Sequence, residues 1–304
     1  MGKFKTALIQ SHWRDTPEDN FNYIIKTIEE IGRQGDVRLI CLPEFFMGPP
    51  WYFPGKIHYK GIVDDTIPGR ITDKLGELAQ KYNAYILGGT IVEREDDKYY
   101  NTSVIISDKG EILGKARKVH CYAAELISIQ AGTEQLIVDT PVGKIGTCVC
   151  SDFWIQEMPR MLALKGAEII YVSGASLIQD IDITRPCILA NSVHNVCYTL
   201  YTSVVGKAVG QRAGLPTFSI EFGGYTTAAS PKEILGTLND EEKVLYAELD
   251  LDYLRELRKV DIKFKNTLYW GLWGRRPELY KDILNPYIEA KSDLKTLLND
   301  YLKD

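Results

Sequence analysis

The sequence of 304 residues contains no apolar run that approaches the length of about 20 residues needed to cross a lipid bilayer. Its first residues, Met1 to Lys3, lead directly into a strand-like segment without the apolar region of a secretory signal. We therefore expect a cytoplasmic protein that has no membrane partner.

The sequence also lacks an excess of positive charge, because 36 Lys and Arg residues stand against 41 Asp and Glu residues. Nucleic-acid-binding surfaces need clustered basic residues, so we expect no nucleic-acid partner. Neither of the glycine-rich patterns that cradle nucleotide phosphates is present. A chain of this length buries a sizeable core without disulfides or metals, so its six cysteines can remain free.

Apolar residues recur with helical spacing in some segments and with strand spacing in others. Helices are predicted over 17–31, 71–82 and 185–195, and from Cys150 to near Gly166. Strands are predicted over 4–10, 37–42, 85–93, 103–107, 111–118, 144–150, 168–173, 198–205, 217–221 and 244–249, with hairpin turns at 108–110 and 141–143. This mixture of crossover and hairpin connections predicts one α/β domain whose sheets are covered by helices.

One cysteine differs in position from four others, which lie within or beside apolar segments where buried thiols are common: Cys41, Cys148, Cys187 and Cys197. Cys150 closes a predicted strand and is followed at once by Ser151 and an expected helix. The dipole at a helix N-terminus favours a thiolate and lowers the thiol pKa. The position of Cys150 fits a nucleophile and a sixth buried thiol equally well.

Two charged residues also stand where predicted strands end. Glu44 follows the buried strand that closes at Leu42-Pro43, and low-dielectric surroundings would raise its pKa and suit it to general acid and base work. Strand alternation sends Lys118 and Arg117 to opposite faces, so an inward Lys118 would stabilise an oxyanion. Each residue also has an ordinary structural interpretation: a surface helix-cap carboxylate for Glu44 and a solvated ammonium for Lys118.

A zinc site is an alternative reading of the same region. Cys148 and Cys150 are two apart in a strand and share a face, and His120 and Cys121 would complete a set of four ligands. The paired C-x2-C spacing typical of zinc sites is absent, so we expect no metal.

Three ordered motifs resemble those of the nitrilase superfamily of carbon-nitrogen hydrolases. They are Leu42-Pro43-Glu44-Phe45, Ala116-Arg117-Lys118-Val119-His120, and Ile145-Gly146-Thr147-Cys148-Val149-Cys150-Ser151-Asp152. The resemblance covers Lys5 to about Arg258 and implies a four-layer α-β-β-α sandwich in which the Glu, Lys and Cys meet at one end of the sheets. We expect a hydrolase domain over 1–275.

The resemblance also implies a mechanism that needs no cofactor. Glu44 would take a proton from Cys150, whose sulfur attacks the substrate carbonyl to form a thioester. Lys118 and the backbone N–H of Ser151 would hold the oxyanion, and Glu125 matches a second family Glu that orients substrate and lysine. A water activated by Glu44 would then hydrolyse the thioester.

The substrate prediction depends on Asp152, which lies two residues after the expected nucleophile Cys150. Asp152 resembles the amidase and carbamoylase branches, whereas nitrilases usually have Trp-Glu directly after the cysteine. We therefore expect a small amide or N-carbamoyl substrate. Phe153-Trp154 replace the arginines that clasp a carboxylate in some carbamoylases, while the segment 275–280 resembles a tail of carbamoyl-group hydrolases. The alternatives are a nitrilase and a catalytically inactive scaffold of the same fold.

The last part of the chain, 276–304, is predicted to be a tail with a final helix capped by Ser292. Its apolar stripe is Leu294, Leu297, Leu298, Tyr301 and Leu302. This periodicity fits packing on its own domain and packing on a partner subunit equally. Because the resemblance implies a homodimer or larger homo-oligomer, the tail is a candidate oligomerisation arm.

Overall fold

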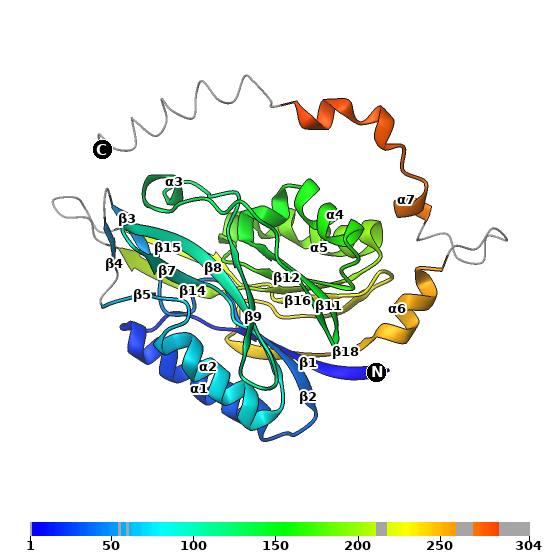
Figure 1. Cartoon of the computed structure of the whole chain (residues 1–304). Helices are drawn as coiled ribbons and strands as arrows, with labels where there is room; N and C mark the ends of the chain where they lie inside the picture. The colour runs from blue at the N-terminus through cyan, green and yellow to red at the C-terminus, as the bar shows by residue number, and fades with distance from the viewer. Residues whose placement is uncertain (1, 54–55, 59–60, 211–217, 260–269, 286–304) are drawn as a thin grey trace.

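The computed structural model describes residues 2–285 except 54–55, 59–60, 211–217 and 260–269. Two sheets form the centre of the fold (Figure 1). The first sheet has the order β18 (Lys243–Asp250), β1 (Lys3–Gln10), β2 (Val37–Cys41), β6 (Tyr85–Leu87), β8 (Lys98–Ile106), β7 (Ile91–Glu95) and β5 (Asp64–Asp65), with β9 (Ile112–Arg117) also paired to β8. The second sheet has the order β10 (Ile137–Thr140), β11 (Gly143–Val149), β12 (Ile169–Ser173), β13 (Tyr198–Thr202), β16 (Thr227–Ala229) and β17 (Ile234–Thr237).

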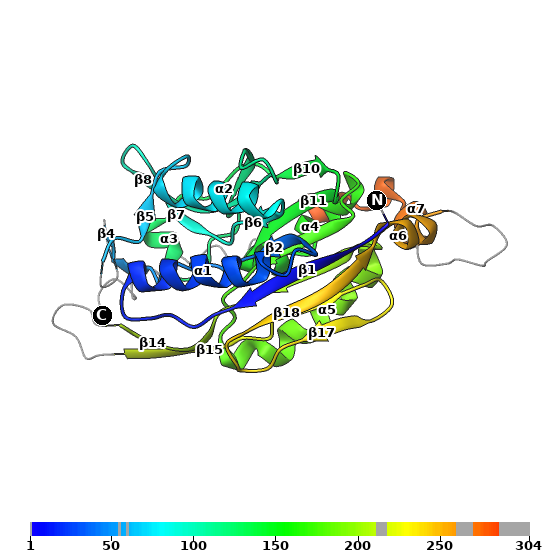
Figure 2. The same cartoon turned by 90° about the horizontal axis from the view of Figure 1, so that it is seen from below.

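Helices cover the outer face of each sheet, which makes four layers (Figures 1 and 2). Helices α1 (Pro17–Gly32) and α2 (Arg70–Tyr82) cover the first sheet, and α4 (Glu157–Leu164) and α5 (Ile181–Asn195) cover the second. The remaining described elements are the two-stranded pairs β3 (Trp51–Phe53) with β4 (Lys56–His58) and β14 (Val205–Gly210) with β15 (Phe218–Gly223), and the short helices α3 (Glu125–Ser128), α6 (Leu251–Leu257), α7 (Trp270–Trp273), η1 (Cys150–Trp154), η2 (Ile178–Asp180), η3 (Pro277–Leu279) and η4 (Lys281–Leu284). The predicted α-β-β-α sandwich is confirmed.

Alternating side chains of the strands fill different layers of the core. In β1, Leu8 packs in the core between the two sheets, while Ala7 and Ile9 pack in the core below α1 and α2. Helix α1 begins as its sequence predicts, because Thr16 Oγ1 accepts a hydrogen bond from Asp19 N at 3.1 Å. The alternation of apolar residues along β1 therefore lets one strand contribute to two layers of the core.

Several predicted boundaries are wrong. The predicted strand 198–205 covers β13 and the first residue of β14, which belongs to a different sheet. The predicted strand 85–93 is two strands, β6 and β7, because Gly89 has a φ of +54° and a Cβ there would lie 2.2 Å from Pro43 O. The predicted helix from Cys150 to Gly166 is the short turn η1 followed by the separate helix α4. Strand β8 begins at Lys98, five residues before the predicted start at Ser103.

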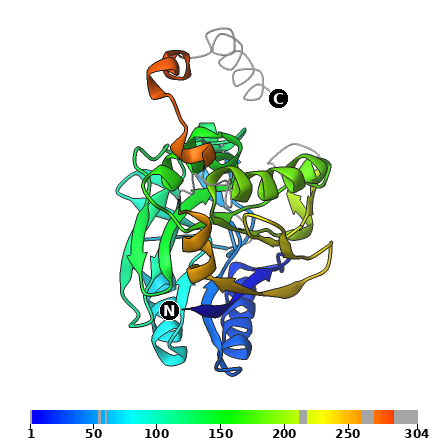
Figure 3. The same cartoon turned by 90° about the vertical axis from the view of Figure 1, so that its right-hand side faces the viewer.

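The segment that carries η3 and η4 lies outside the four layers, as the orange part at the top of Figure 3 shows, whereas α7 packs against α5. A groove lies between this segment and helices α4 and α5, and its lining includes Trp154, Arg160 and Tyr280. The predicted tail 276–304 lies mostly outside the described residues, since its expected helical stripe falls within 286–304. None of the helices in the described part of the chain is both long and apolar enough to span a membrane.

Candidate active site

The site lies where strands from both sheets end. The carboxyl ends of β2, β9 and β11 lead to Glu44, Lys118 and Cys150, respectively. Hydrogen bonds join the end of β2 to the second sheet. The carbonyl oxygen of Leu42 accepts hydrogen bonds from Thr202 Oγ1 at 2.8 Å and from Tyr171 Oη. The backbone N–H of Glu44 also donates to Gly174 O at 3.3 Å, directly after β12.

Cys150 occupies a strained backbone position at the start of η1. Its φ is +44°, in the left-handed region that L residues other than Asn and Asp rarely adopt. The residue is only partly buried, in contrast to Cys148, which is fully buried in the core two residues earlier. The turn therefore places Cys150 at the end of β11, outside the regular strand geometry.

The expected lowering of the Cys150 pKa is wrong. Burial of the thiol and the nearby Glu44 carboxylate raise its pKa to about 12, although Lys118 acts in the opposite direction. The five-residue turn η1 takes the place of the long helix whose dipole was expected to favour the thiolate. A thiol in this environment needs a base to remove its proton as it reacts.

Glu44 is almost fully buried, with 1% of its surface exposed. Burial and the charge of Glu125 raise its pKa, while Lys118 and Asn101 act in the opposite direction. The next residue, Phe45, has a φ of +50°, and its N–H donates to Thr90 Oγ1 at 2.8 Å, which secures the turn. The predicted raised pKa of the Glu44 carboxyl is thus confirmed in direction.

Lys118 is buried, with 2% of its side chain exposed, and its ammonium bridges two carboxylates. Its Nζ lies 3.0 Å from Glu44 Oε1 and 2.7 Å from Glu125 Oε2. Burial opposes its charge, but these carboxylates and the Cys150 sulfur keep the Lys118 pKa well above its ordinary value. Arg117 points the other way, into an ion-pair cluster with Glu93 and Glu95, as strand alternation predicts.

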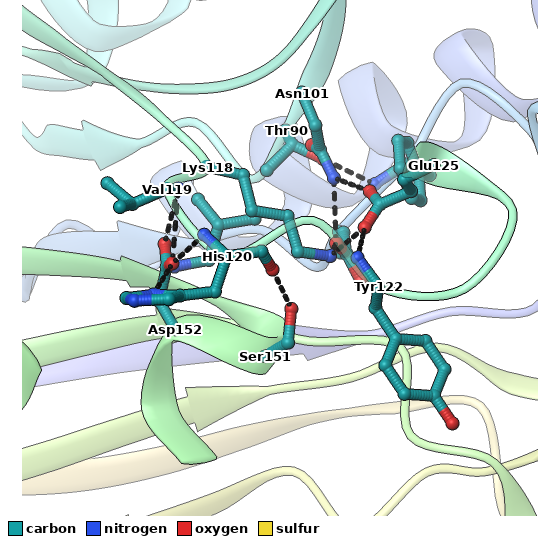
Figure 4. Close-up of polar contacts among 12 residues, drawn as sticks. Thr90, Asn101, Lys118, Val119, His120, Tyr122, Glu125, Ser151 and Asp152 are labelled. Atoms are coloured by element: carbon teal, nitrogen blue, oxygen red, sulfur yellow. Dashed lines mark hydrogen bonds and ion pairs between the residues drawn. The ribbon is translucent and has the colours of Figure 1, made fainter. Parts of the chain in front are cut away.

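Glu125, the fourth expected position, is buried at the start of α3. Its Oε2 accepts a hydrogen bond from Tyr122 N at 2.8 Å, and its Oε1 accepts one from Asn101 Nδ2 at 2.8 Å (Figure 4). The same Asn101 Nδ2 donates to Glu44 Oε1 at 2.9 Å. Sequence reasoning missed Asn101 because the predicted strand began two residues after it; the alternating run from Lys98 onwards was the available signal.

Asp152 joins the loop after Lys118 to the turn that carries Cys150. Its carboxylate accepts a hydrogen bond from Val149 N at 3.2 Å. It also accepts one from His120 N at 2.8 Å, and its Oδ1 lies 2.9 Å from His120 Nδ1 (Figure 4). Ser151 Oγ donates to His120 O in the same junction. These contacts fix the position of the Lys118 strand end relative to Cys150.

The zinc alternative has no ligand set in the described residues. No group of three or more His, Cys, Asp or Glu side chains there could hold a metal ion. Cys148 is sealed in the core below α4, and Cys121 packs beside the apolar cluster that contains Phe45 and Ile129. Of the four cysteines expected in the core, Cys41, Cys148 and Cys197 are fully buried and Cys187 is partly exposed.

The structure thus brings Lys118 into direct contact with both Glu44 and Glu125, although the three residues come from separate segments. Cys150 lies close enough to all three for their charges to act on its pKa. The arrangement combines a thiol, a base that retains protons and a buried cation. These groups are able to support nucleophilic attack and to stabilise an oxyanion.

Comparisons with known proteins agree with this geometry. The family model described as carbon-nitrogen hydrolase matches residues 5–259. An omega-amidase of Xenopus laevis is 29% identical over 273 residues, which cover 85% of this chain and 93% of that protein.

Solved structures show the same fold. The crystal structure of a carbon-nitrogen hydrolase from Helicobacter pylori G27 matches with a TM-score of 0.82 at 24% identity, over 94% of this chain and 100% of that one. Nit3 of Saccharomyces cerevisiae, a member of the nitrilase superfamily, matches with a TM-score of 0.72 at 25% identity, over 87% of this chain and 96% of that one. The family resemblance expected from the three motifs is confirmed, and the chain belongs to the carbon-nitrogen hydrolase family.

Proposed function

We propose that this carbon-nitrogen hydrolase is an amidase that cleaves a small amide through a thioester on Cys150. The observation that carries the proposal is the buried Lys118, whose ammonium is held between the carboxylates of Glu44 and Glu125 beside the thiol. A buried cation held by two carboxylates is a preorganised donor for an oxyanion. The similarity to an omega-amidase supports an amide substrate.

The first half of the reaction forms the thioester. Glu44 takes the Sγ proton while the sulfur attacks the amide carbon, because the raised pKa of Cys150 leaves little thiolate beforehand. Two N–H groups of Lys118 point to Glu44 and Glu125, and the third is available to the oxyanion together with the backbone N–H of Ser151. The C–N bond then breaks, and Glu44 gives its proton to the departing nitrogen.

The second half releases the acid. A water gives one proton to the Glu44 carboxylate and attacks the thioester carbon. The tetrahedral intermediate then expels the Cys150 sulfur, which recovers its proton from Glu44. The raised pKa of Glu44 suits both directions of proton transfer, because a carboxyl with an ordinary pKa would hold the proton too weakly.

The choice among amide, N-carbamoyl and nitrile substrates rests on Asp152 and on the relatives. Asp152 anchors the nucleophile turn through Val149 N and His120 N, where nitrilases usually carry Trp-Glu after the cysteine. The nitrilase and inactive-scaffold alternatives are not favoured, since the matched relatives include omega-amidases and Lys118 pairs directly with the Glu44 carboxylate. N-carbamoyl compounds remain within the proposed substrate class.

Ammonia release from a panel of small amides, ureido compounds and nitriles tests the proposal. We expect release from at least one amide or ureido compound, with kcat/KM at least about tenfold above that for the matching nitrile, which corresponds to about 1.4 kcal/mol of discrimination. Intact mass spectrometry during turnover should show an acyl adduct that maps to Cys150.

The matched control is Cys150→Ala, which should fold and release no ammonia above the uncatalysed rate. Release that is equal in wild type and Cys150→Ala, or no release from the whole panel, would overturn the proposal. A cytoplasmic location, a single hydrolase domain over 1–275 and a homodimer joined by the tail 276–304 also remain predictions. Fractionation and sedimentation of the full chain would test the location and the dimer.

A further inference from the structure

Asn101 lies in the middle of β8 with no exposed surface, next to the groups that the proposed reaction uses. Its backbone carbonyl accepts a hydrogen bond from Lys118 N at 2.8 Å. Its side-chain Nδ2 donates to Glu44 Oε1 at 2.9 Å and to Glu125 Oε1 at 2.8 Å (Figure 4). One residue therefore contacts all three charged members of the site.

The orientation of the Asn101 amide is set by its neighbours. An amide nitrogen carries two N–H groups, and here each has a carboxylate oxygen as its acceptor. The opposite orientation would place Oδ1 against the same two carboxylates and lose both hydrogen bonds. In the present orientation Oδ1 is buried, and within the described residues it has no hydrogen-bond partner.

An unpartnered buried amide oxygen is costly for the folded state. A hydrophobic residue of similar size would avoid this cost, so structural packing alone does not account for an amide here. The two carboxylates carry two negative charges, whereas Lys118 supplies one positive charge. Two N–H groups aimed at the carboxylates offset part of this imbalance without adding a titratable group.

We propose that Asn101 is a positioning residue that clamps the carboxylates of Glu44 and Glu125 on either side of Lys118. The clamp holds Glu44 in the orientation from which it reaches the Cys150 thiol, and it favours the ionised carboxylate that accepts the proton. This inference rests on the proposed function, because it assigns Asn101 a role in the same reaction. It extends that function by adding a residue that touches neither the substrate nor the sulfur.

Asn101→Leu removes both donated hydrogen bonds while nearly preserving side-chain volume. We expect kcat to fall about tenfold to a hundredfold, as for hydrogen bonds to charged groups, with KM changed by less than about threefold. The acid limb of the kcat profile should move upward by about one pH unit, because the lost N–H groups no longer favour the Glu44 carboxylate. Asn101→Ser, which keeps one donor, should give an intermediate shift.

Asn191→Leu is the matched control. Asn191 is also buried, and its Nδ2 donates to Thr199 Oγ1 at 2.8 Å on the other side of the second sheet. Its loss should lower the melting temperature by a similar amount and leave kcat and the pH profile unchanged. If Asn101→Leu does not fold, the shift in Asn101→Ser decides the question.

A second readout does not depend on turnover. The pH dependence of Cys150 alkylation by iodoacetamide, followed by peptide mapping, should also show an acid limb that moves upward in both Asn101 variants. An unchanged acid limb in turnover and in alkylation would overturn the clamp. A wild type that releases no ammonia while its alkylation limb still shifts on substitution would instead reject the proposed function and keep the clamp.

Discussion

Arg117 and Lys118 are neighbours in the chain, and their side chains enter two charge clusters of different kinds. The outer cluster consists of Glu93, Glu95, Lys115 and Arg117, and the inner cluster consists of Glu44, Lys118, Glu125 and Asn101. In the outer cluster, Arg117 Nε lies 2.8 Å from Glu93 Oε2, and the side chains of Arg117 and Glu95 are 21% and 49% exposed. In the inner cluster, the three charged side chains are 5% exposed or less.

The pKa of Glu93 in the outer cluster and the pKa of Glu44 in the inner cluster are shifted in opposite directions. Burial acts against the charge of Glu93, but hydrogen bonds from Arg117, Lys115 and Thr102 lower its pKa overall. Burial raises the pKa of Glu44, and the single Lys118, shared with Glu125, only partly offsets it. Two cations balance two carboxylates in the outer cluster, whereas one cation serves two in the inner cluster. Balanced charges stabilise the fold, while the unbalanced set leaves a base that retains protons.

The largest expected difference between the two clusters is in their effect on kcat/KM. Substitution of the neighbouring residues Lys118 and Arg117 tests it directly. Lys118→Met should reduce kcat/KM by about 1,000-fold or more, because it removes the proposed oxyanion donor from a buried site. Arg117→Met should reduce it by less than about threefold, as expected for a substitution outside the reacting groups. Steady-state kinetics on folded variants, checked by circular dichroism, gives both values. Equal losses in the two variants would break the comparison.

For stability we expect the opposite pattern, in which substitutions in the outer cluster lower the free energy of unfolding and change kcat little. Glu93→Gln should lower the free energy of unfolding at pH 7 by about 1–3 kcal/mol, since it removes charge-assisted hydrogen bonds at a buried position, and leave kcat within about twofold. Glu95→Gln, at a half-exposed position where solvent screens the ion pair, should lower the free energy of unfolding far less. Urea unfolding measures both differences.

The pH dependence of the Glu93→Gln effect has a definite sign. The folded-state pKa of Glu93 lies below its ordinary 4.5, so its stabilising contribution is fully present above that value. The contribution is lost as the pH falls through the lower folded-state value. The stability gap between wild type and Glu93→Gln should therefore narrow in acid, and a gap that stays constant down to acid denaturation would contradict the assignment.

A small effect is also expected for Ser151, which lies next to the inner cluster. Ser151→Ala removes the hydrogen bond to His120 O but keeps the backbone N–H that is proposed to hold the oxyanion. We expect kcat to fall by less than about fivefold, compared with the hundredfold or more that follows loss of an oxyanion donor. Steady-state kinetics distinguishes these two outcomes, and a hundredfold fall in kcat would assign a direct role to the Ser151 hydroxyl.

Features that depend only on neighbouring residues, such as the face to which a strand residue points, were predictable from the sequence. Strand alternation assigned Lys118 and Arg117 to opposite faces, and the helix predicted over 17–31 begins where α1 begins, at Pro17. Asn101 was not predictable in the same way, because the start of β8 was placed at Ser103. Its contacts with Glu44 and Glu125 depend on segments 57 and 24 residues away, which no local pattern describes.

The sequence alone determined most of the helices and strands and the residue types of the site, because periodicity and short motifs depend on neighbours along the chain. The layered sandwich followed from the resemblance of three motifs to the nitrilase superfamily. Tertiary structure alone decided which charges meet and how each thiol and carboxyl titrates. Lys118 and Glu44, for example, are 74 residues apart and become partners only when the sandwich closes. Distance and burial set electrostatic energies, and both arise from the packing of distant segments. For that reason the expected pKa shift of Cys150 had the wrong sign, while the expected shift of Glu44 had the right one.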